Sequence, residues 1–273
     1  MNLTNEEIER YDRQLKMWGV DGQSSIQKSV IYVVGAKNIG AEVCKNALLS
    51  GSTVFLSDDT MAVEGKLHWF YRYEQGNTIA QCSYEGLNVL NEFATLEIVT
   101  PGSFNFNRVS FCVYTESDVQ TALSLSKACR ETGAHFIWCF CNENEGLVFL
   151  DAHIHEYSTK QIESRGSRRM KYVPLDTTVV DRIQELLSND IEIFSQLNTS
   201  QMCFLTGTMI GAYASQEILK TLTHIEQPIY NTFHLDNENR PVGRVQFIGE
   251  EFSHEYVNAE EEEEVPRTMH VSL

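Results

Sequence analysis

The sequence lacks an apolar run approaching the roughly 18 residues that a membrane-spanning helix requires. No apolar segment follows a basic stretch at the amino terminus, so we expect no secretory signal and a soluble protein in a reducing compartment. The seven cysteines include no C-x-x-C pair, which argues against a structural zinc site and favours free thiols. Cys139 and Cys141 lie in an apolar run and are expected in the core, and Cys203 has no nearby histidine that would activate it as a nucleophile.

Positive charge is scarce, since 21 Lys and Arg residues face 38 Asp and Glu residues, giving a net charge of -17. Nucleic-acid binding needs clustered Lys and Arg, so this composition argues against it and favours a protein partner with a basic face. Part of the acidic excess is the block Glu260 to Glu264, which predicts a disordered acidic tail over 251–273. The polar, basic segment 156–172 predicts a mobile loop.

No internal repeat and no Pro- or Gly-rich linker divides the chain, which predicts one domain over 4–250. The β-branched run "SVIYVVGA" (29–36) predicts a buried strand, "NIGAEVCKNALLSG" (38–51) a helix that ends at glycine, and "TVFLSDD" (53–59) a second strand. Strand-like and helix-like segments continue to alternate, as in "RVSFCVYT" and "AHFIWCF". This alternation predicts an α/β fold with a doubly wound sheet.

The turn between the first strand and the first helix after it is where a nucleotide-binding fold holds phosphates. Gly35 and Gly40 flank this turn, but Lys37 takes the place of the second glycine of a dinucleotide fingerprint and Asn38 follows it. These side chains fill space that a phosphate needs, although Lys37 keeps a cation there. The sequence favours an empty or weak nucleotide site.

Three histidines stand in suggestive contexts. His68, in "LHWF", lies beside aromatic residues with no acid at a useful spacing, which favours a packed side chain over a catalytic imidazole. His153 and His155 alternate along a strand and share one face, but no third metal ligand is evident. We therefore predict no metal site and assign both histidines to the surface.

The segment "RYDRQLKMWGVDGQSSIQKSVIYVVGAKNIGAEVCKNALLSG" (10–51) resembles the amino-terminal region of the activating enzymes for ubiquitin-like proteins. "HFIWCFCNENEGLVFLDAHIHEY" and "GTMIGAYASQEILKTLTHIEQPIYNTFHLD" are similar to the central strand pair and the late helix and strand of that family. The positions that carry the resemblance in the first segment are Tyr11, Asp12, Arg13, Gln14, Trp18, Gly19, Gln23, Gly35, Gly40, Glu42, Lys45, Asn46 and Gly51.

The resemblance implies a Rossmann-like doubly wound sheet of the ThiF/MoeB type and a role in adenylating the carboxy-terminal glycine of a modifier with ATP and Mg²⁺. It also implies a degenerate nucleotide site. Active members carry a G-x-G-G-x-G turn, whose inner glycines Lys37 and Asn38 replace here. A ribose-binding acid remains as Asp58 or Asp59. The family's asparagine, arginine and glutamine before a phenylalanine, and its lysine on the next helix, correspond here to Leu67, His68 and Trp69 before Phe70, and to Asn77.

With these phosphate-binding groups replaced, the resemblance implies the non-catalytic subunit of a heterodimer, with SUMO favoured as the modifier. ATP and Mg²⁺ would then be held by the large catalytic subunit, no cofactor by this chain, and the complex would lie in the nucleus and cytoplasm. Arg13, from the Y-D-R-Q motif, would reach the partner's nucleotide while Tyr11, Leu15 and Trp18 anchor its helix. Candidate contacts with the partner lie in "GTMIGAYASQEILK", namely Gly207, Met209, Ile210 and Gly211.

Two alternatives stay open. One is the regulatory subunit of a NEDD8-activating enzyme, whose long additional domain does not fit within 273 residues. The other belongs to a different class, a dinucleotide-dependent Rossmann oxidoreductase, which the alternation of strands and helices permits. The missing second glycine argues against the oxidoreductase, and tight NAD binding by the isolated chain would favour it.

Overall fold

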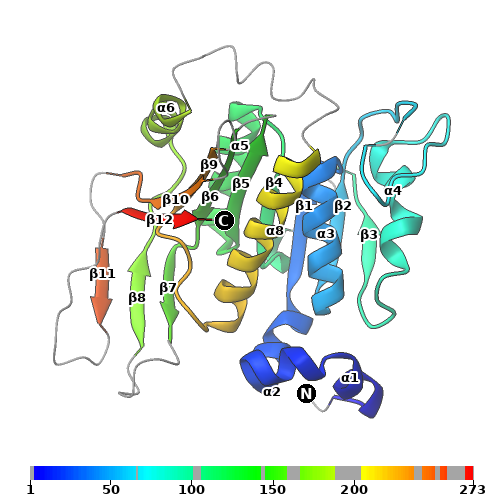
Figure 1. Ribbon diagram of the computed structural model, residues 1–273, viewed down its shortest axis with the longest axis horizontal. Helices are drawn as coiled ribbons and strands as arrows, with labels where there is room; N and C mark the ends of the chain where they lie inside the picture. The colour runs from blue at the N-terminus through cyan, green and yellow to red at the C-terminus, as the bar shows by residue number, and fades with distance from the viewer. Residues whose placement is uncertain are drawn as a thin grey trace.

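The computed structural model describes residues 3–65, 67–100, 106–142, 145–158, 167–187, 204–236, 242–249, 253–256 and 268–272. The chain opens with α1 (Asn5–Arg10) and α2 (Asp12–Lys28), which project below the main body in Figure 1. Helix α2 is kinked at Gly19, whose φ of 73° lies in the left-handed region that glycine tolerates. The kink separates an outer arm from the inner half of α2, which leads into the first strand.

A nine-stranded sheet forms the centre of the described residues, in the order β12-β10-β9-β6-β5-β4-β1-β2-β3. The strands β3, β2, β1, β4 and β5 run parallel, and β6, β9, β10 and β12 extend the sheet with antiparallel pairings. Their bounds are β1 (Val30–Val34), β2 (Thr53–Ser57), β3 (Leu96–Ile98), β4 (Phe111–Tyr114), β5 (His135–Cys141), β6 (Glu145–Asp151), β9 (Thr232–Asp236), β10 (Val242–Gln246) and β12 (Thr268–Ser272).

Helices cover both faces of this sheet, because alternate residues of each strand point to opposite sides. On one face Ile31 and Val33 pack with α3 (Asn38–Ser50), α4 (Ile79–Asn88) and α8 (Phe204–Thr223). On the other face Tyr32 and Trp138 pack with α5 (Val119–Thr132) and α6 (Thr177–Leu186), close to the short 3-10 helix η1 (Phe106–Arg108). The predicted doubly wound α/β fold is confirmed, and its order reverses between β1 and β4, where such sheets bind ligands.

A second sheet of three antiparallel strands lies beside the first, in the order β11-β8-β7 (Figure 1). It consists of β7 (Ile154–Tyr157), β8 (Arg168–Lys171) and β11 (Ser253–Tyr256). The loop expected over 156–172 is therefore wrong at both ends, where cross-strand pairing orders the backbone. The disordered tail expected over 251–273 is likewise wrong at β11 and β12, whereas Glu260 to Glu264 lie outside the described residues.

The described cysteines are free thiols in the core, as expected for Cys139 and Cys141, and Cys203 lies outside the described residues. Among the helices of the described ranges, none combines the length and apolar character needed to cross a membrane. The limits of a single domain over 4–250 stay a prediction.

Candidate functional site

The turn that follows β1 lies at the point where the strand order reverses, between β1 and β4. Gly35 has a φ of 101°, and a Cβ atom there would lie 2.3 Å from Thr115 Oγ1, beyond the end of β4. A Cβ atom on Gly40 would lie 1.9 Å from the carbonyl oxygen of Gly35. Both glycines are therefore required because the turn packs closely against α3 and against the residue that follows β4. This requirement comes from packing within the chain and does not depend on a bound ligand.

The polar groups of this turn are engaged by the chain's own side chains. The backbone N–H of Ala36 donates to Asp58 Oδ2 at 2.8 Å, and Lys37 Nζ lies 2.9 Å from Glu116 Oε2. Asp58 also accepts from the N–H of Thr60, whereas Asp59 is exposed. Of the two candidate acids, Asp58 is the one that faces the turn.

Glu116 makes the electrostatic environment of the turn unfavourable for an anion. Burial raises the pKa of its carboxyl, Lys37 opposes that rise, and the nearby Asp58 adds to it. A phosphate at this turn would meet two carboxylates, while the cation that Lys37 supplies is already paired. Glu116 follows β4 and lies 79 residues from Lys37, so no local sequence pattern predicts this pair.

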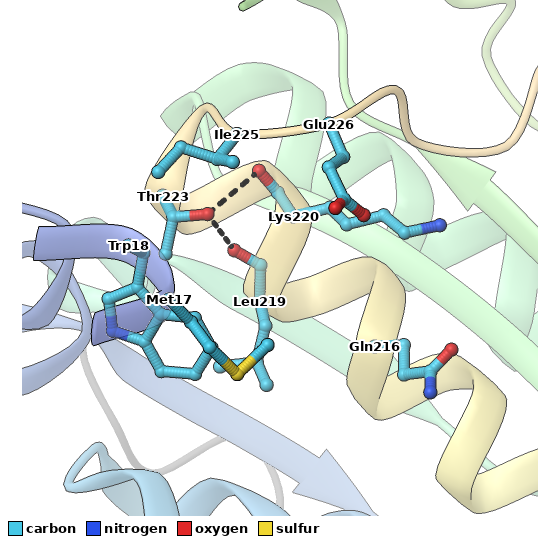
Figure 2. A pocket seen from close by; sticks show the side chains of 8 residues that line it. All are labelled: Met17, Trp18, Gln216, Leu219, Lys220, Thr223, Ile225 and Glu226. Atoms are coloured by element: carbon cyan, nitrogen blue, oxygen red, sulfur yellow. Dashed lines mark hydrogen bonds between the residues drawn. The ribbon is translucent and has the colours of Figure 1, made fainter. Parts of the chain in front are cut away.

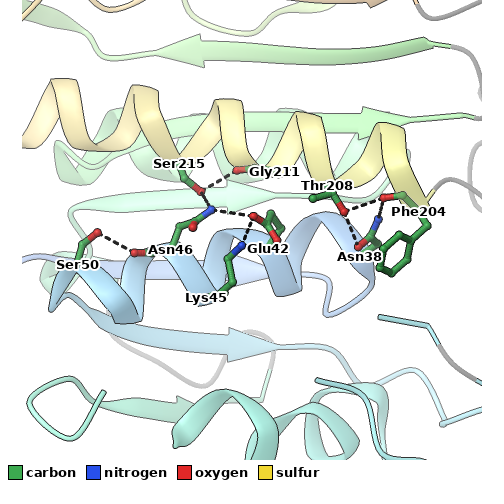
Figure 3. A network of polar contacts seen from close by, with 9 residues as sticks. All are labelled: Asn38, Glu42, Lys45, Asn46, Ser50, Phe204, Thr208, Gly211 and Ser215. Carbon is green, nitrogen blue, oxygen red and sulfur yellow. Dashed lines mark hydrogen bonds and ion pairs between the residues drawn. The ribbon is translucent and has the colours of Figure 1, made fainter. Parts of the chain in front are cut away.

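Asn38 joins the start of α3 to the start of α8 (Figure 3). Its Nδ2 donates to the carbonyl oxygen of Phe204 at 2.7 Å, and the same carbonyl accepts from Thr208 Oγ1. A Cβ atom on Gly207 would lie 2.6 Å from Asn38 Nδ2. The Asn38 side chain is thus held between the two helices.

The contact between α3 and α8 continues along both helices. Glu42 accepts from Lys45 and Asn46, and Asn46 Nδ2 donates to Ser215 Oγ at 3.2 Å (Figure 3). A Cβ atom on Gly211 would lie 2.7 Å from Glu42 Cβ. The glycines therefore permit close helix packing inside this chain.

This packing corrects the expectation for the partner surface. Gly207 and Gly211 contact α3, Ile210 is fully buried, and Met209 packs against the core. Gly207, Ile210 and Gly211 are therefore taken up by packing within this chain, whereas Met209 is only partly buried.

The segment between β2 and α4 contains the positions at which the resemblance implies replaced phosphate-binding groups. His68 is only 2% exposed, with Nδ1 accepting from the N–H of Phe70 and Nε2 lying 3.0 Å from Ser83 Oγ. Burial lowers its pKa to about 4, so the ring is neutral near pH 7, and its packed role is confirmed. Trp69 stacks edge-on against Phe204, and Asn77 donates to Glu74. None of these three side chains brings a cation to the turn.

The outer arm, residues 4–18, is fastened to the body by specific contacts. Thr4 and Glu7 form a capping box at the start of α1. Tyr11 is fully buried and its hydroxyl accepts from Asn91, while Gln14 Nε2 donates to the carbonyl oxygen of Leu49. Trp18 Nε1 donates to Gln23.

Arg13 lies on the opposite, exposed side of this arm. Within the described residues its guanidinium makes no hydrogen bond or ion pair, whereas Arg10 donates to the carbonyl oxygen of Leu90. The arm therefore presents Arg13 outward on a firmly held helix.

A groove of about 260 Å³ lies between the arm and the end of α8 (Figure 2). Met17, one helical turn after Arg13, is 59% exposed at its edge. The charged groups on its wall are Lys220, paired with the buried Glu217, and Glu226. This lining offers no nucleophile with an adjacent base. The lining residues are Met17, Trp18, Gln216, Leu219, Lys220, Thr223, Ile225 and Glu226.

The sequence pattern predicts both His153 and His155 at the surface, and this is wrong for His155, which is buried. His155 is 2% exposed, and its ring stacks on that of His224, at the end of α8. His135, the first residue of β5, lies between the rings of His153 and His155. Within the described ranges, no group of three or more His, Cys, Asp or Glu residues is placed to hold a metal ion.

Comparison with known proteins finds partial similarity to SUMO-activating enzyme subunits. No family model matches the chain. It is 27% identical over 167 residues to SUMO-activating enzyme subunit 1 of Dictyostelium discoideum, covering 58% of this chain and 51% of the relative. It is 27% identical over 175 residues to SUMO-activating enzyme subunit 1A of Arabidopsis thaliana, covering 59% of this chain and 54% of that relative. The aligned region thus spans about half the length of these relatives.

Solved structures extend the likeness over nearly the whole fold. The crystal structure of PaaA aligns with a TM-score of 0.61 at 14% identity, covering 93% of this chain and 83% of PaaA. The crystal structure of E. coli MccB with succinimide aligns with a TM-score of 0.58 at 11% identity, covering 91% and 71%. The chain therefore shares its Rossmann-like α/β fold with these two structures.

Proposed function

We propose that this chain is the non-catalytic subunit of a heterodimeric activating enzyme for a ubiquitin-like modifier, with SUMO favoured. The observation that carries the proposal is the turn after β1, which retains the shape of a nucleotide-binding turn while the chain's own side chains occupy it. Lys37 pairs with Glu116, Asn38 holds Phe204, and Asp58 takes the N–H of Ala36. The SUMO-activating enzyme subunits among its relatives support the choice of modifier.

Adenylation needs cations or N–H donors aimed at developing negative charge on the phosphates. The turn of this chain instead offers two carboxylates and a lysine that is already paired. We therefore assign ATP and Mg²⁺ to the large catalytic subunit and no cofactor to this chain. The complex works in the nucleus and cytoplasm under this proposal.

Arg13 is assigned a role in trans, toward the phosphates of the nucleotide in the partner. A guanidinium is always charged and binds two phosphate oxygens at once. The support from this chain is that Arg13 is exposed and has no hydrogen bond or ion pair within the described residues, on an arm held by Tyr11, Gln14 and Trp18.

The purified chain alone is expected to show no ATP–pyrophosphate exchange with SUMO or another ubiquitin-like protein, because its turn does not stabilise a triphosphate. The same assay on the chain mixed with a SUMO-activating catalytic subunit serves as the positive control. Robust exchange by the chain alone would contradict the assignment of the non-catalytic role. Tight binding of NAD by the chain alone would instead favour the oxidoreductase alternative.

Affinity purification of the tagged chain from native extract is expected to recover one stoichiometric partner, the catalytic subunit. Obligate interfaces bury on the order of 2,000 Å² or more, so the complex is expected to stay intact during sedimentation. The modifier that the purified complex charges decides between SUMO and NEDD8. A monomer that ignores the catalytic subunits of both pathways would contradict the heterodimer.

A further inference from the structure

Four histidines far apart in the sequence meet where the three-stranded sheet joins the main body. The rings of His135 and His153 are 5.6 Å apart between centroids, and those of His135 and His155 are 6.4 Å apart. His155 and His224 stack with centroids 4.9 Å apart and planes 14° from parallel. We call these four residues the histidine cluster.

Among the described residues, no acidic side chain beside the cluster is free to neutralise added protons. The Asp151 carboxylate is paired with Arg130 of α5, whose Nε lies 2.6 Å from Asp151 Oδ2. It also accepts a hydrogen bond from the backbone N–H of His153. The Glu156 carboxylate of β7 is paired with Arg169 of β8.

The other neighbours of the cluster are apolar or exposed. Opposite His155 on β8 lies the buried, apolar Met170. Glu226, which follows α8, is exposed, so water screens its charge. Since His224 is exposed and His153 half-buried, it is a charge on His135 or His155 that would be left without compensation.

Two buried ring nitrogens of the cluster lack hydrogen-bond partners, His135 Nδ1 and His155 Nε2. Protonating either ring would place a charge beside other imidazoles in a buried setting. Burial, together with the neighbouring histidines, accordingly lowers the pKa of His135 to about 4 and that of His155 to about 3.

The contacts of the cluster also hold the corner that follows α8. His224 Nδ1 lies 2.7 Å from the carbonyl oxygen of Glu156, and the N–H of Ser158 donates to the carbonyl oxygen of His224 at 2.9 Å. His224 and Glu226 have φ values of 56° and 67°, in the left-handed region that costs energy for residues other than glycine. The corner therefore depends on its contacts with β7 to keep its conformation.

We propose that the histidine cluster is an acid-sensitive latch, which docks the sheet of β7, β8 and β11 onto the end of α8 when neutral and releases it when protonated. Release breaks the stacking of His155 on His224 and the backbone bonds between Ser158 and the corner. Thr223, Ile225 and Glu226 of this corner also line the groove of Figure 2, so release changes the groove beside the outer arm.

The direction of the pH effect follows from proton linkage. A released histidine titrates near its ordinary value of about 6.5, whereas the docked rings of His135 and His155 have lowered pKa values. The released state therefore binds more protons below about pH 6.5, and its population rises as the pH falls. With two such histidines the opening constant rises by up to about 100-fold per pH unit, and it is flat above about pH 7.

Hydrogen exchange of the full chain at about pH 7 and about pH 5, corrected for intrinsic exchange rates, tests the latch. Between the higher and the lower pH, the protection factors of amides in β7 and β8 are expected to fall. Their fall is expected to be at least about tenfold larger than that of amides in β1 and β4. A parallel loss in all four strands would overturn the proposal, because it would report global acid unfolding.

A variant separates titration from packing. His155→Phe keeps an aromatic ring for the stack on His224 but has no proton to gain, so only His135 still titrates and the opening constant is expected to rise by up to about tenfold per pH unit, against about 100-fold in the parent chain. The matched control is His68→Gln, a second buried histidine in the segment before α4, which is expected to leave the ratio of β7 to β1 exchange unchanged. An acid response of His155→Phe equal to that of the parent chain would overturn the latch.

If His155→Phe fails to fold, NMR titration of the imidazoles in the parent chain tests the latch instead. Two rings, those of His135 and His155, are expected to stay neutral until the latch opens and then to protonate together with the loss of β7 protection. Independent titration of both rings near pH 6.5, with β7 still protected, would contradict the latch.

Discussion

Arg13→Ala in the assembled heterodimer is expected to slow adenylation of the modifier by about tenfold or more. The guanidinium would stabilise charge that grows on the phosphates in the transition state, and alanine leaves that charge uncompensated. Dimer assembly is expected to be unaffected, because the arm is held by the buried Tyr11 and the half-buried Trp18 and not by Arg13. Single-turnover formation of the modifier adenylate at limiting ATP measures the effect.

Lys16→Ala provides the matched control, since Lys16 is another exposed cation on the same helix and pairs only with Asp12. Its loss is expected to leave the rate of adenylation within about twofold of the parent. Arg13→Lys is expected to recover part of the rate, because an ammonium keeps the charge but not the bidentate geometry. An Arg13→Ala complex that forms adenylate at the parental rate would make Arg13 a purely structural residue.

Gly40→Ala is expected to lower the free energy of unfolding by about 3 kcal/mol. In an ordinary helix the same change would stabilise by up to about 1 kcal/mol, so the sign of the effect tests the packing. The added Cβ would meet the backbone carbonyl of Gly35 at 1.9 Å, and backbone cannot move aside as a flexible side chain does. Urea unfolding followed by circular dichroism measures the difference.

Gly133→Ala is the control for backbone strain without a clash. Gly133 has a φ of 79° but no atom within 4 Å of an added Cβ, so the expected cost is about 1 kcal/mol. A Gly40→Ala chain as stable as the parent would show that α3 can move away from the turn. The close approach of α3 to β1 would then not be a fixed property of the site.

Local patterns in the sequence were sufficient for much of the fold. The predicted strand, helix and strand over 29–59 correspond to β1, α3 and β2, since buried β-branched runs and a terminal glycine act over a few residues. The capping box of Thr4 and Glu7 and the packed state of His68 are local in the same sense. The role of Arg13 stays a prediction.

Features that depend on contacts between residues far apart in the sequence could not be predicted from local sequence patterns. Strand β8 has the sequence "RRMK", which lacks the apolar alternation of a strand and is ordered by β7 and β11 on either side. Glu116 and His224 have no distinguishing neighbours in the sequence and gain their roles only where the fold brings them to Lys37 and His155. The small residues of α8 predicted close helix approach, but not whether the neighbour was α3 or another chain.

The anchored arm affects how the partner is met. Since α1 and α2 are already docked through Tyr11, Gln14 and Trp18, the arm does not have to fold when the proposed catalytic subunit binds. The ordering cost at Arg13 is confined to its own side chain, about 2 kcal/mol at most. Association is therefore expected to follow a single bimolecular phase, without a separate folding phase of the arm. The free energy of binding is also not reduced by the conformational entropy that a folding arm would lose.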